Sequence, residues 1–124
     1  MRKLATAAVL LVLGCAPAAA EAKQGISGDV LDSTCYGPCV IDQNPPPYAG
    51  DDVVVEVRDA SNGDLVATAV PHDGRFRVRL GRGRYSVHAE VSDPLWESEP
   101  PQTLRVRRDE FAHVELLVWN AAIV

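Results

Sequence analysis

A period-two alternation of apolar and polar residues, repeated in several short runs, constrains the fold of this chain most strongly. Apolar residues hold alternate positions in the runs 53–57, 76–80 and 85–91. Successive side chains of a strand point to opposite faces of a sheet, so each run predicts a strand with one buried and one exposed face. From Gly25 onward no run has the 3.6-residue period of an amphipathic helix. The alternation therefore predicts an all-β domain.

Turn-forming residues separate these runs. Asn62-Gly63 and Asp73-Gly74 are sequences that favour tight hairpins, and Gly81-Arg82-Gly83 predicts a further reversal. The predicted strands are Gly25–Leu31, Asp52–Asp59, Leu65–Val70, Arg75–Leu80, Arg84–Val91, Gln102–Arg107 and Phe111–Trp119. Seven short strands at this spacing are typical of a seven-stranded antiparallel β-sandwich of transthyretin-like or Ig-like architecture.

The N-terminal segment has a different character. Met1-Arg2-Lys3 precedes an apolar run from Leu4 to Leu13, which is the pattern of an export signal and is too short for a stable membrane span. The signal can end in two ways. Gly14-Cys15 resembles a bacterial lipobox, in which the Cys is diacylated and becomes the new N-terminus. The alternative is cleavage after Ala20 at an A-x-A site, which would release a soluble protein.

We favour acylation of Cys15, because the apolar run ends directly at Gly14-Cys15. Residues 1–14 are then a lipoprotein signal peptide, 15–24 a tether and 25–124 the domain. Two acyl chains suffice for stable anchoring. This predicts an exported lipoprotein of the cell membrane or outer membrane, whereas cleavage after residue 20 would give a soluble periplasmic or secreted protein.

The chain has three cysteines, Cys15, Cys35 and Cys39. In an oxidising exported setting Cys35 and Cys39 can pair, and either way of ending the signal accounts for Cys15. Gly37-Pro38 between the two supplies a turn that a small disulfide loop would need. A redox-active pair or a zinc site is the alternative, but a zinc site needs further ligands that are not close in the sequence. We predict a structural disulfide between Cys35 and Cys39.

The charge balance argues against nucleic acid as a partner. The chain has 12 basic and 17 acidic residues, net −5, and loss of Arg2 and Lys3 with the signal leaves net −7. Nucleic-acid-binding domains normally carry a net basic charge. The net charge differs between the two halves of the chain: it is −8 for residues 21–73 and +1 for residues 74–124.

Arginines of the second half form a candidate binding patch. Arg75, Arg77 and Arg79 alternate on one predicted strand, and we expect Arg84 to lie near them across the Gly81–Gly83 turn. The full candidate set is Arg75, Arg77, Arg79, Arg84, Arg105 and Arg107, with Trp96 as an aromatic contact. The alternative is that the arginines pair with acids across strands and solvate a sheet face, while Trp96 caps the open end of the core.

Several short motifs resemble the carboxypeptidase regulatory-like domain. Gly28-x-Val30 on a first strand is followed by Val53-x-Val55-x-Val57, then by Asp73-Gly74-Arg75-Phe76 and Leu80-Gly81-Arg82-Gly83-Arg84-Tyr85, and the resemblance spans roughly residues 25–118. It implies a transthyretin-like β-sandwich of a secreted bacterial protein and no peptidase activity. A long insert around Cys35–Tyr48 departs from the family pattern.

The sequence shows no catalytic or cofactor motif. His72, His88 and His113 are isolated from one another, and none of the serines belongs to a G-x-S-x-G turn. We therefore expect no metal, no cofactor and no enzymatic activity. The predicted function is a non-catalytic accessory or binding module of the cell envelope, with an unknown envelope protein or glycan as its partner. A small hydrolase or metal-binding protein is the alternative, and a purely structural envelope protein is a third.

Overall fold

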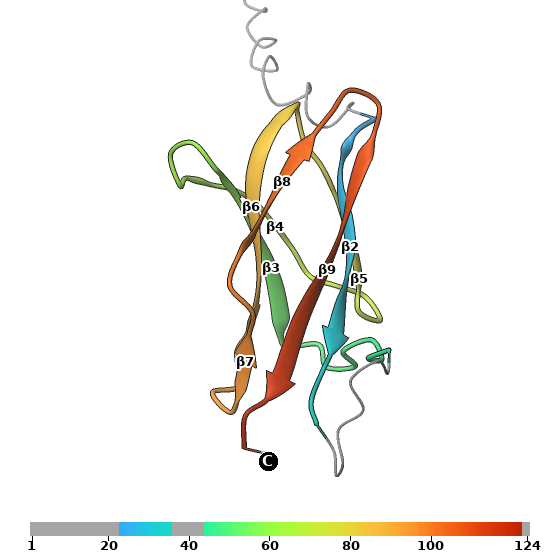
Figure 1. The fold of residues 1–124 in the computed structure, drawn as a ribbon, viewed down its shortest axis with the longest axis vertical. Helices are drawn as coiled ribbons and strands as arrows, with labels where there is room; N and C mark the ends of the chain where they lie inside the picture. Colours follow the sequence, from blue (N-terminus) through green and yellow to red (C-terminus); the bar gives the residue numbers. More distant parts are fainter. Residues whose placement is uncertain (1–22, 36–43, 123–124) are drawn as a thin grey trace, which may run out of the picture.

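The computed structural model describes residues 23–35 and 44–122. Within these residues eight strands form two four-stranded sheets that pack face to face (Figure 1). The strands are β2 (Gly25–Asp32), β3 (Val53–Asp59), β4 (Leu65–Ala69), β5 (Arg75–Arg79), β6 (Gly83–Val91), β7 (Trp96–Ser98), β8 (Gln102–Val106) and β9 (Phe111–Asn120). The all-β sandwich predicted from the alternation is confirmed. No helix in these residues is long and apolar enough to cross a membrane.

The sheets have the orders β5-β2-β9-β7 and β4-β3-β6-β8. In the second sheet all neighbours are antiparallel, as predicted. In the first sheet β2 runs parallel to β9, with Gly25 opposite Phe111 and Asp32 opposite Val118. The prediction of a wholly antiparallel sandwich is wrong at this pair. The first and last described strands lie side by side at the centre of one sheet, and both start at the same end of the molecule (Figure 1).

The prediction of seven strands is also wrong, because no strand was predicted between Val91 and Gln102, where β7 lies. This strand is three residues long and lies between Pro94 and Pro100-Pro101. It pairs with the end of β9, Trp96 lying opposite Asn120. A strand this short has too few residues to show an alternating pattern, and the flanking prolines indicate a loop.

The core consists mainly of valines from the inward positions of both sheets. Val53, Val55 and Val57 of β3 are almost fully buried. Glu56, which lies between two of these valines, and Arg58, which follows the last, reach solvent. The other strands of both sheets add further buried apolar residues to the core: Ile26, Val30, Phe76, Val78, Val87, Ala89, Val91, Val106, Val114, Leu116 and Val118. Each fully buried valine contributes about 1.5–3 kcal/mol relative to exposure, which makes this layer the main source of stability.

Two turns have the conformations that their glycines predicted. Asn62-Gly63 connects β3 to β4 as an antiparallel hairpin, with Gly63 at φ 80°. At Asp73-Gly74 both residues have positive φ, 53° and 77°, and His72 and Arg75 exchange backbone hydrogen bonds. That is the two-residue reversal for which Asp-Gly is favoured. Gly81–Gly83, in contrast, leads from β5 in one sheet to β6 in the other, so these two strands do not form a hairpin.

The predicted signal peptide, Cys15 and most of the tether lie outside the described residues, as does Cys39. The lipid anchor and the Cys35–Cys39 disulfide therefore stay predictions. The described chain begins at Lys23 beside the start of β2, and its C-terminal end lies at the opposite end of the sandwich (Figure 1).

Candidate functional site

The outer face of the sheet β5-β2-β9-β7 carries a group of charged and polar side chains that could bind a ligand. Because β5 and β9 both pair with β2, residues at matching positions lie in rows across the three strands. One row contains Arg75, Asp29 and Glu115. The adjacent outward row contains Arg77, Ser27 and His113. Strand alternation directs all six away from the core, so guanidinium groups lie at the β5 edge, with carboxylates and an imidazole beside them.

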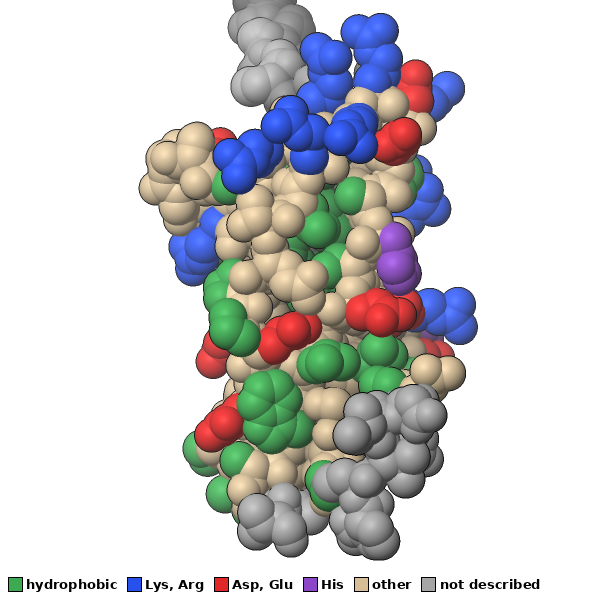
Figure 2. Space-filling view, in the orientation of Figure 1, with side chains coloured by type: hydrophobic (Ala, Val, Ile, Leu, Met, Phe, Trp, Pro, Cys, Tyr) green, Lys and Arg blue, Asp and Glu red, His purple; other side chains and the backbone are tan. Residues whose placement is uncertain are grey.

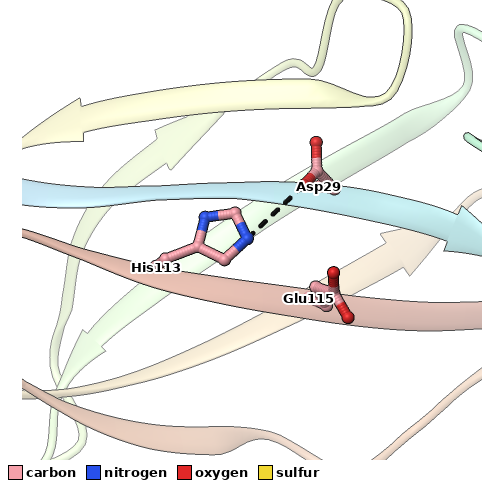
Figure 3. Close-up of side chains that lie close together, drawn as sticks. All are labelled: Asp29, His113 and Glu115. Carbon is pink, nitrogen blue, oxygen red and sulfur yellow. Dashed lines mark ion pairs between the residues drawn. The ribbon is translucent and has the colours of Figure 1, made fainter.

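Asp29, His113 and Glu115 form a cluster of possible metal ligands on this face. His113 Nε2 lies 3.5 Å from Asp29 Oδ2, and one donor atom from each of the three residues lies within 4.8 Å of the others. Figure 3 shows the side chains on the neighbouring strands β2 and β9. One imidazole nitrogen and two carboxylates are a ligand set that a divalent ion such as Zn²⁺ accepts.

Sequence reasoning missed this cluster because its ligands come from two strands. His113 was treated as isolated, since no second histidine stands near it in the sequence. The available indication was His113-x-Glu115, in which two ligand types share one face of a strand. The third ligand depends on the parallel pairing of β2 with β9, which the sequence did not predict.

A shallow depression of about 810 Å³ lies beside the cluster. Its lining comes from three strands and the turn before β5: Ser27, Gly28, Asp29, His72, Asp73, Arg75, Phe76, Arg77 and His113. The guanidinium of Arg77 lies over the ring of Phe111, with Cζ 3.8 Å from the ring centroid. This depression is open and mixed in charge, which suits charged groups of a partner.

The six arginines of the candidate patch do not form one surface. Arg75, Arg77 and Arg79 lie on β5, as predicted, on the sheet that contains β2 and β9. Arg84 lies on β6 opposite Arg105 of β8, in the other sheet. The expectation that Arg84 lies near the β5 strand positions assumed a hairpin at Gly81–Gly83, and the crossing between sheets overturns it.

A second group of cations lies at the end of the sandwich where the described chain begins. Gln24 holds this corner together, since its backbone carbonyl accepts a hydrogen bond from Leu80 N at 3.1 Å and its side chain accepts one from Asp109 N at 3.0 Å. The turn after β8 and the link into β6 therefore lie next to Lys23. We call the resulting group the basic end: Lys23, Arg82, Arg84, Arg105, Arg107 and Arg108. Lys and Arg side chains crowd this end in Figure 2.

Trp96 lies apart from these cations. It packs against the core, and its ring meets that of Tyr48 edge-on with centroids 4.9 Å apart. This packing is what the interpretation of Trp96 as a cap on the open end of the core expects, and it separates Trp96 from the arginines of the candidate patch. Tyr48 is buried and donates a hydrogen bond to Asp52 Oδ1 at 2.7 Å. Burial, together with this bond to a carboxylate, raises the pKa of Tyr48 above its usual value.

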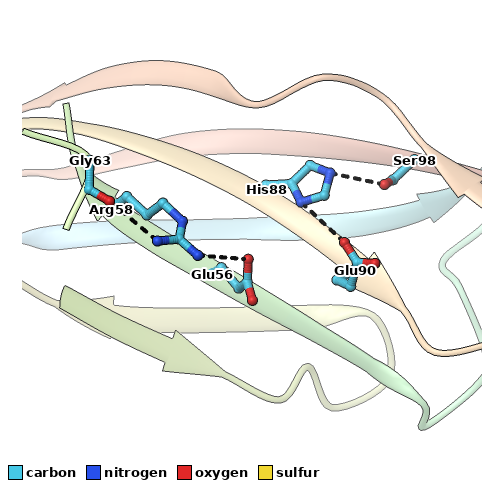
Figure 4. A network of polar contacts seen from close by, with 6 residues as sticks. All are labelled: Glu56, Arg58, Gly63, His88, Glu90 and Ser98. Carbon is cyan, nitrogen blue, oxygen red and sulfur yellow. Dashed lines mark hydrogen bonds and ion pairs between the residues drawn. The ribbon is translucent and has the colours of Figure 1, made fainter. Parts of the chain in front are cut away.

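The other two histidines have structural partners. His88 on β6 shares a hydrogen bond of 3.1 Å with Ser98 of β7, which joins the two sheets, and its Nδ1 lies 3.6 Å from Glu90 (Figure 4). On the same sheet Arg58 lies 3.6 Å from Glu56 (Figure 4). His72 is exposed in the turn beside Asp73. Of the three histidines, His113 alone contributes to the described ligand cluster.

In the hairpin turn between β3 and β4, the carboxylate of Asp59 forms hydrogen bonds within the turn itself. Asp59 Oδ1 accepts hydrogen bonds from Ser61 N at 2.8 Å and Ser61 Oγ at 2.6 Å. These bonds favour the ionised form and lower the pKa of Asp59. The same turn borders the basic end, because Ala60 N donates to the carbonyl of Arg84 at 3.0 Å.

No protein-family model and no curated protein matches the sequence. Among solved structures the chain is similar to GBS52, the minor pilin of the gram-positive pathogen Streptococcus agalactiae, with a TM-score of 0.55 and 14% sequence identity. The match covers 78% of this chain and 44% of the pilin chain, so the protein spans less than half of that neighbour. The comparison supports a β-sandwich domain. It does not show the narrower carboxypeptidase regulatory-like family.

Proposed function

We propose that the protein is a non-catalytic binding module of a bacterial cell envelope, held at a membrane by acyl chains on Cys15. The sequence supports export and acylation through the apolar run that ends at Gly14-Cys15. The ordered turn and strand motifs support a carboxypeptidase regulatory-like type of sandwich. The observation that most supports a binding role is the open depression on the outer face of β5-β2-β9-β7, which Arg75 and Arg77 help to line.

The proposed partner is an envelope protein or glycan that carries carboxylate or phosphate groups. Arg75 and Arg77 lie on a strand paired along its length with β2, so their backbone positions are fixed. Arginine binds both anions through paired hydrogen bonds. Asp29 and His113 on the other side of the depression add groups that can accept or donate hydrogen bonds.

Site-specific photo-crosslinking in the source cells tests this role. A benzophenone amino acid replaces Ser27, which lines the depression, and in a control it replaces Thr68, which is exposed on β4 of the other sheet. We expect an adduct of defined mass from position 27 alone. R75Q/R77Q should abolish this adduct without a change in the circular dichroism spectrum. Equal adducts from positions 27 and 68, or an adduct from position 27 that persists in R75Q/R77Q, would contradict the proposal.

Metal binding is a second candidate function, favoured by the proximity of Asp29, His113 and Glu115. Three protein ligands with a fourth position left to water or a ligand are a common zinc arrangement. Zinc titration by calorimetry should give one site per chain. H113A should remove it, and H72A, which changes an exposed histidine of the same depression outside the cluster, should keep it. Equal zinc binding by the two variants would exclude this site.

A further inference from the structure

The charge of the described domain is separated along its long axis. The basic end contains six cations, and four carboxylates share this end of the sandwich: Asp59, Asp64, Asp109 and Glu110. The rest of the described surface is strongly acidic. Apart from the Glu56–Arg58 pair and from Arg79, which lies opposite Gly25 where β5 meets the basic end, its cations are Arg75 and Arg77. Its carboxylates are Asp29, Asp32, Asp51, Asp52, Asp73, Glu90, Asp93, Glu97, Glu99 and Glu115. One pole is therefore net positive and the remainder net negative.

Among the described residues, the cations of the basic end form no ion pairs. Within residues 23–35 and 44–122, no salt bridge involves Lys23, Arg82, Arg84, Arg105, Arg107 or Arg108. Arg84 and Arg105 lie opposite each other on neighbouring strands, a like-charge pair that is unfavourable unless an anion is nearby. The five arginines are exposed. This group of side chains is therefore available to an external anionic surface.

The position of the predicted anchor indicates which surface that is. The described chain begins at Lys23, which belongs to the basic end, so only residues 15–22 lie between this end and Cys15 in the sequence. Even fully extended, these residues span only about 28 Å. An acylated Cys15 thus keeps the basic end within that distance of the bilayer. Such a short tether gives an effective concentration in the millimolar range, so that weak contacts are enough to orient the domain.

We propose that the basic end docks on the anionic headgroups of the membrane that holds the anchor. This inference rests on the acylation of Cys15 in the proposed function. Lys and Arg side chains are attracted to an anionic leaflet, and the opposite, acidic pole is repelled from the same surface. The domain then stands with β2 and β9 starting at the membrane, while Tyr48 and Trp96 lie at the far end, away from the bilayer (Figure 1).

Co-sedimentation with lipid vesicles tests the docking separately from the anchor. The mature chain 15–124 is prepared without acyl chains and mixed with vesicles of phosphatidylcholine alone or of equimolar phosphatidylcholine and phosphatidylglycerol. At low ionic strength we expect binding to the anionic vesicles only. Binding should be lost as salt rises toward 1 M, where the Debye length falls to about 3 Å.

A matched pair of variants locates the contact. R107Q/R108Q removes two cations from the basic end and should weaken binding to anionic vesicles at least about tenfold. R75Q/R77Q removes the same charge from the outer face of β5, and it should bind anionic vesicles as the unchanged chain does, or slightly better. Equal losses in the two variants, or no preference for anionic vesicles at low salt, would overturn the proposal.

Two further outcomes are decisive. If the chain ignores anionic vesicles but binds a soluble polyanion such as polyphosphate through the same arginines, the surface serves a different partner and the membrane assignment is wrong. Acylation of Cys15 is measured independently, by the mass of the native protein. Failure of the vesicle assay with an acylated native protein therefore refutes the docking and leaves the anchor intact.

Discussion

The guanidinium of Arg77 on β5 lies over the ring of Phe111 on β9, with Cζ 3.8 Å from the ring centroid. These two strands are not neighbours, because β2 separates them in the sheet. The contact therefore spans the central strand and restrains the Arg77 side chain against the sheet face. A restrained arginine loses less conformational entropy when it binds an anion, which suits its place beside the depression.

A double-mutant cycle measures this contact. R77Q and F111L are made singly and together, and the free energy of unfolding of each variant is obtained from urea titrations. We expect a coupling energy of about 0.5–1 kcal/mol, the range for a cation–π pair at an exposed site. Strictly additive single effects would mean that the two side chains do not interact in solution.

Gly28 provides a test of the packing at the centre of the first sheet. A Cβ at this position would lie 2.3 Å from the carbonyl oxygen of Val114 and 2.8 Å from Cζ of Phe76. Since a strand backbone cannot give way easily, G28A should destabilise the domain by about 1–3 kcal/mol. G81A is the matched control, because nothing lies within 4 Å of its added Cβ. Equal stability of the two variants would contradict the described approach of β2 to β9.

The alternation of side chains predicted the core but could not predict the pairing of strands. Val53, Val55 and Val57 are buried as their spacing indicated, because local period-two patterning directly specifies which face is apolar. The parallel pair of β2 and β9 joins residues far apart in the chain, and no local pattern encodes such a pair. The reversal at Gly81–Gly83 was predicted, but whether it joins strands of one sheet or of two depends on the whole topology.

The same limit explains what was missed in the candidate site. Arg75 and Arg77 were correctly placed on one strand, since a single run of sequence contains both. The association of Asp29 with His113 depends on the register of β2 against β9, and the separation of Arg84 from β5 depends on the crossing between sheets. The basic end combines residues from several turns with Lys23, so only the folded chain shows it.

Tyr48 gives the domain a predictable response to alkaline pH. Burial and the hydrogen bond to Asp52 raise its pKa in the folded state, so the neutral phenol is favoured there. This contribution to stability is complete below the unfolded-state pKa of about 10 and is lost as the pH rises above it.

Y48F should lower the free energy of unfolding at neutral pH by about 1 kcal/mol, because the hydrogen bond to Asp52 is lost. It should also flatten the decline in stability above about pH 10. Y85F serves as the comparison, since it retains Tyr48 and hence the Tyr48 part of the decline. Urea titrations across the alkaline range measure both slopes. An unchanged slope in Y48F would show that Tyr48 is not protected from ionisation.

The intact mass of the protein purified from the membrane fraction of its source cells tests the central claim most directly. The account predicts residues 15–124 carrying acyl chains on Cys15, with a mass lower by two hydrogen atoms than that of the reduced form because Cys35 and Cys39 are joined. A soluble protein that starts after Ala20 and carries no lipid would contradict the account, because the domain would then have no tether to hold its basic end at a membrane.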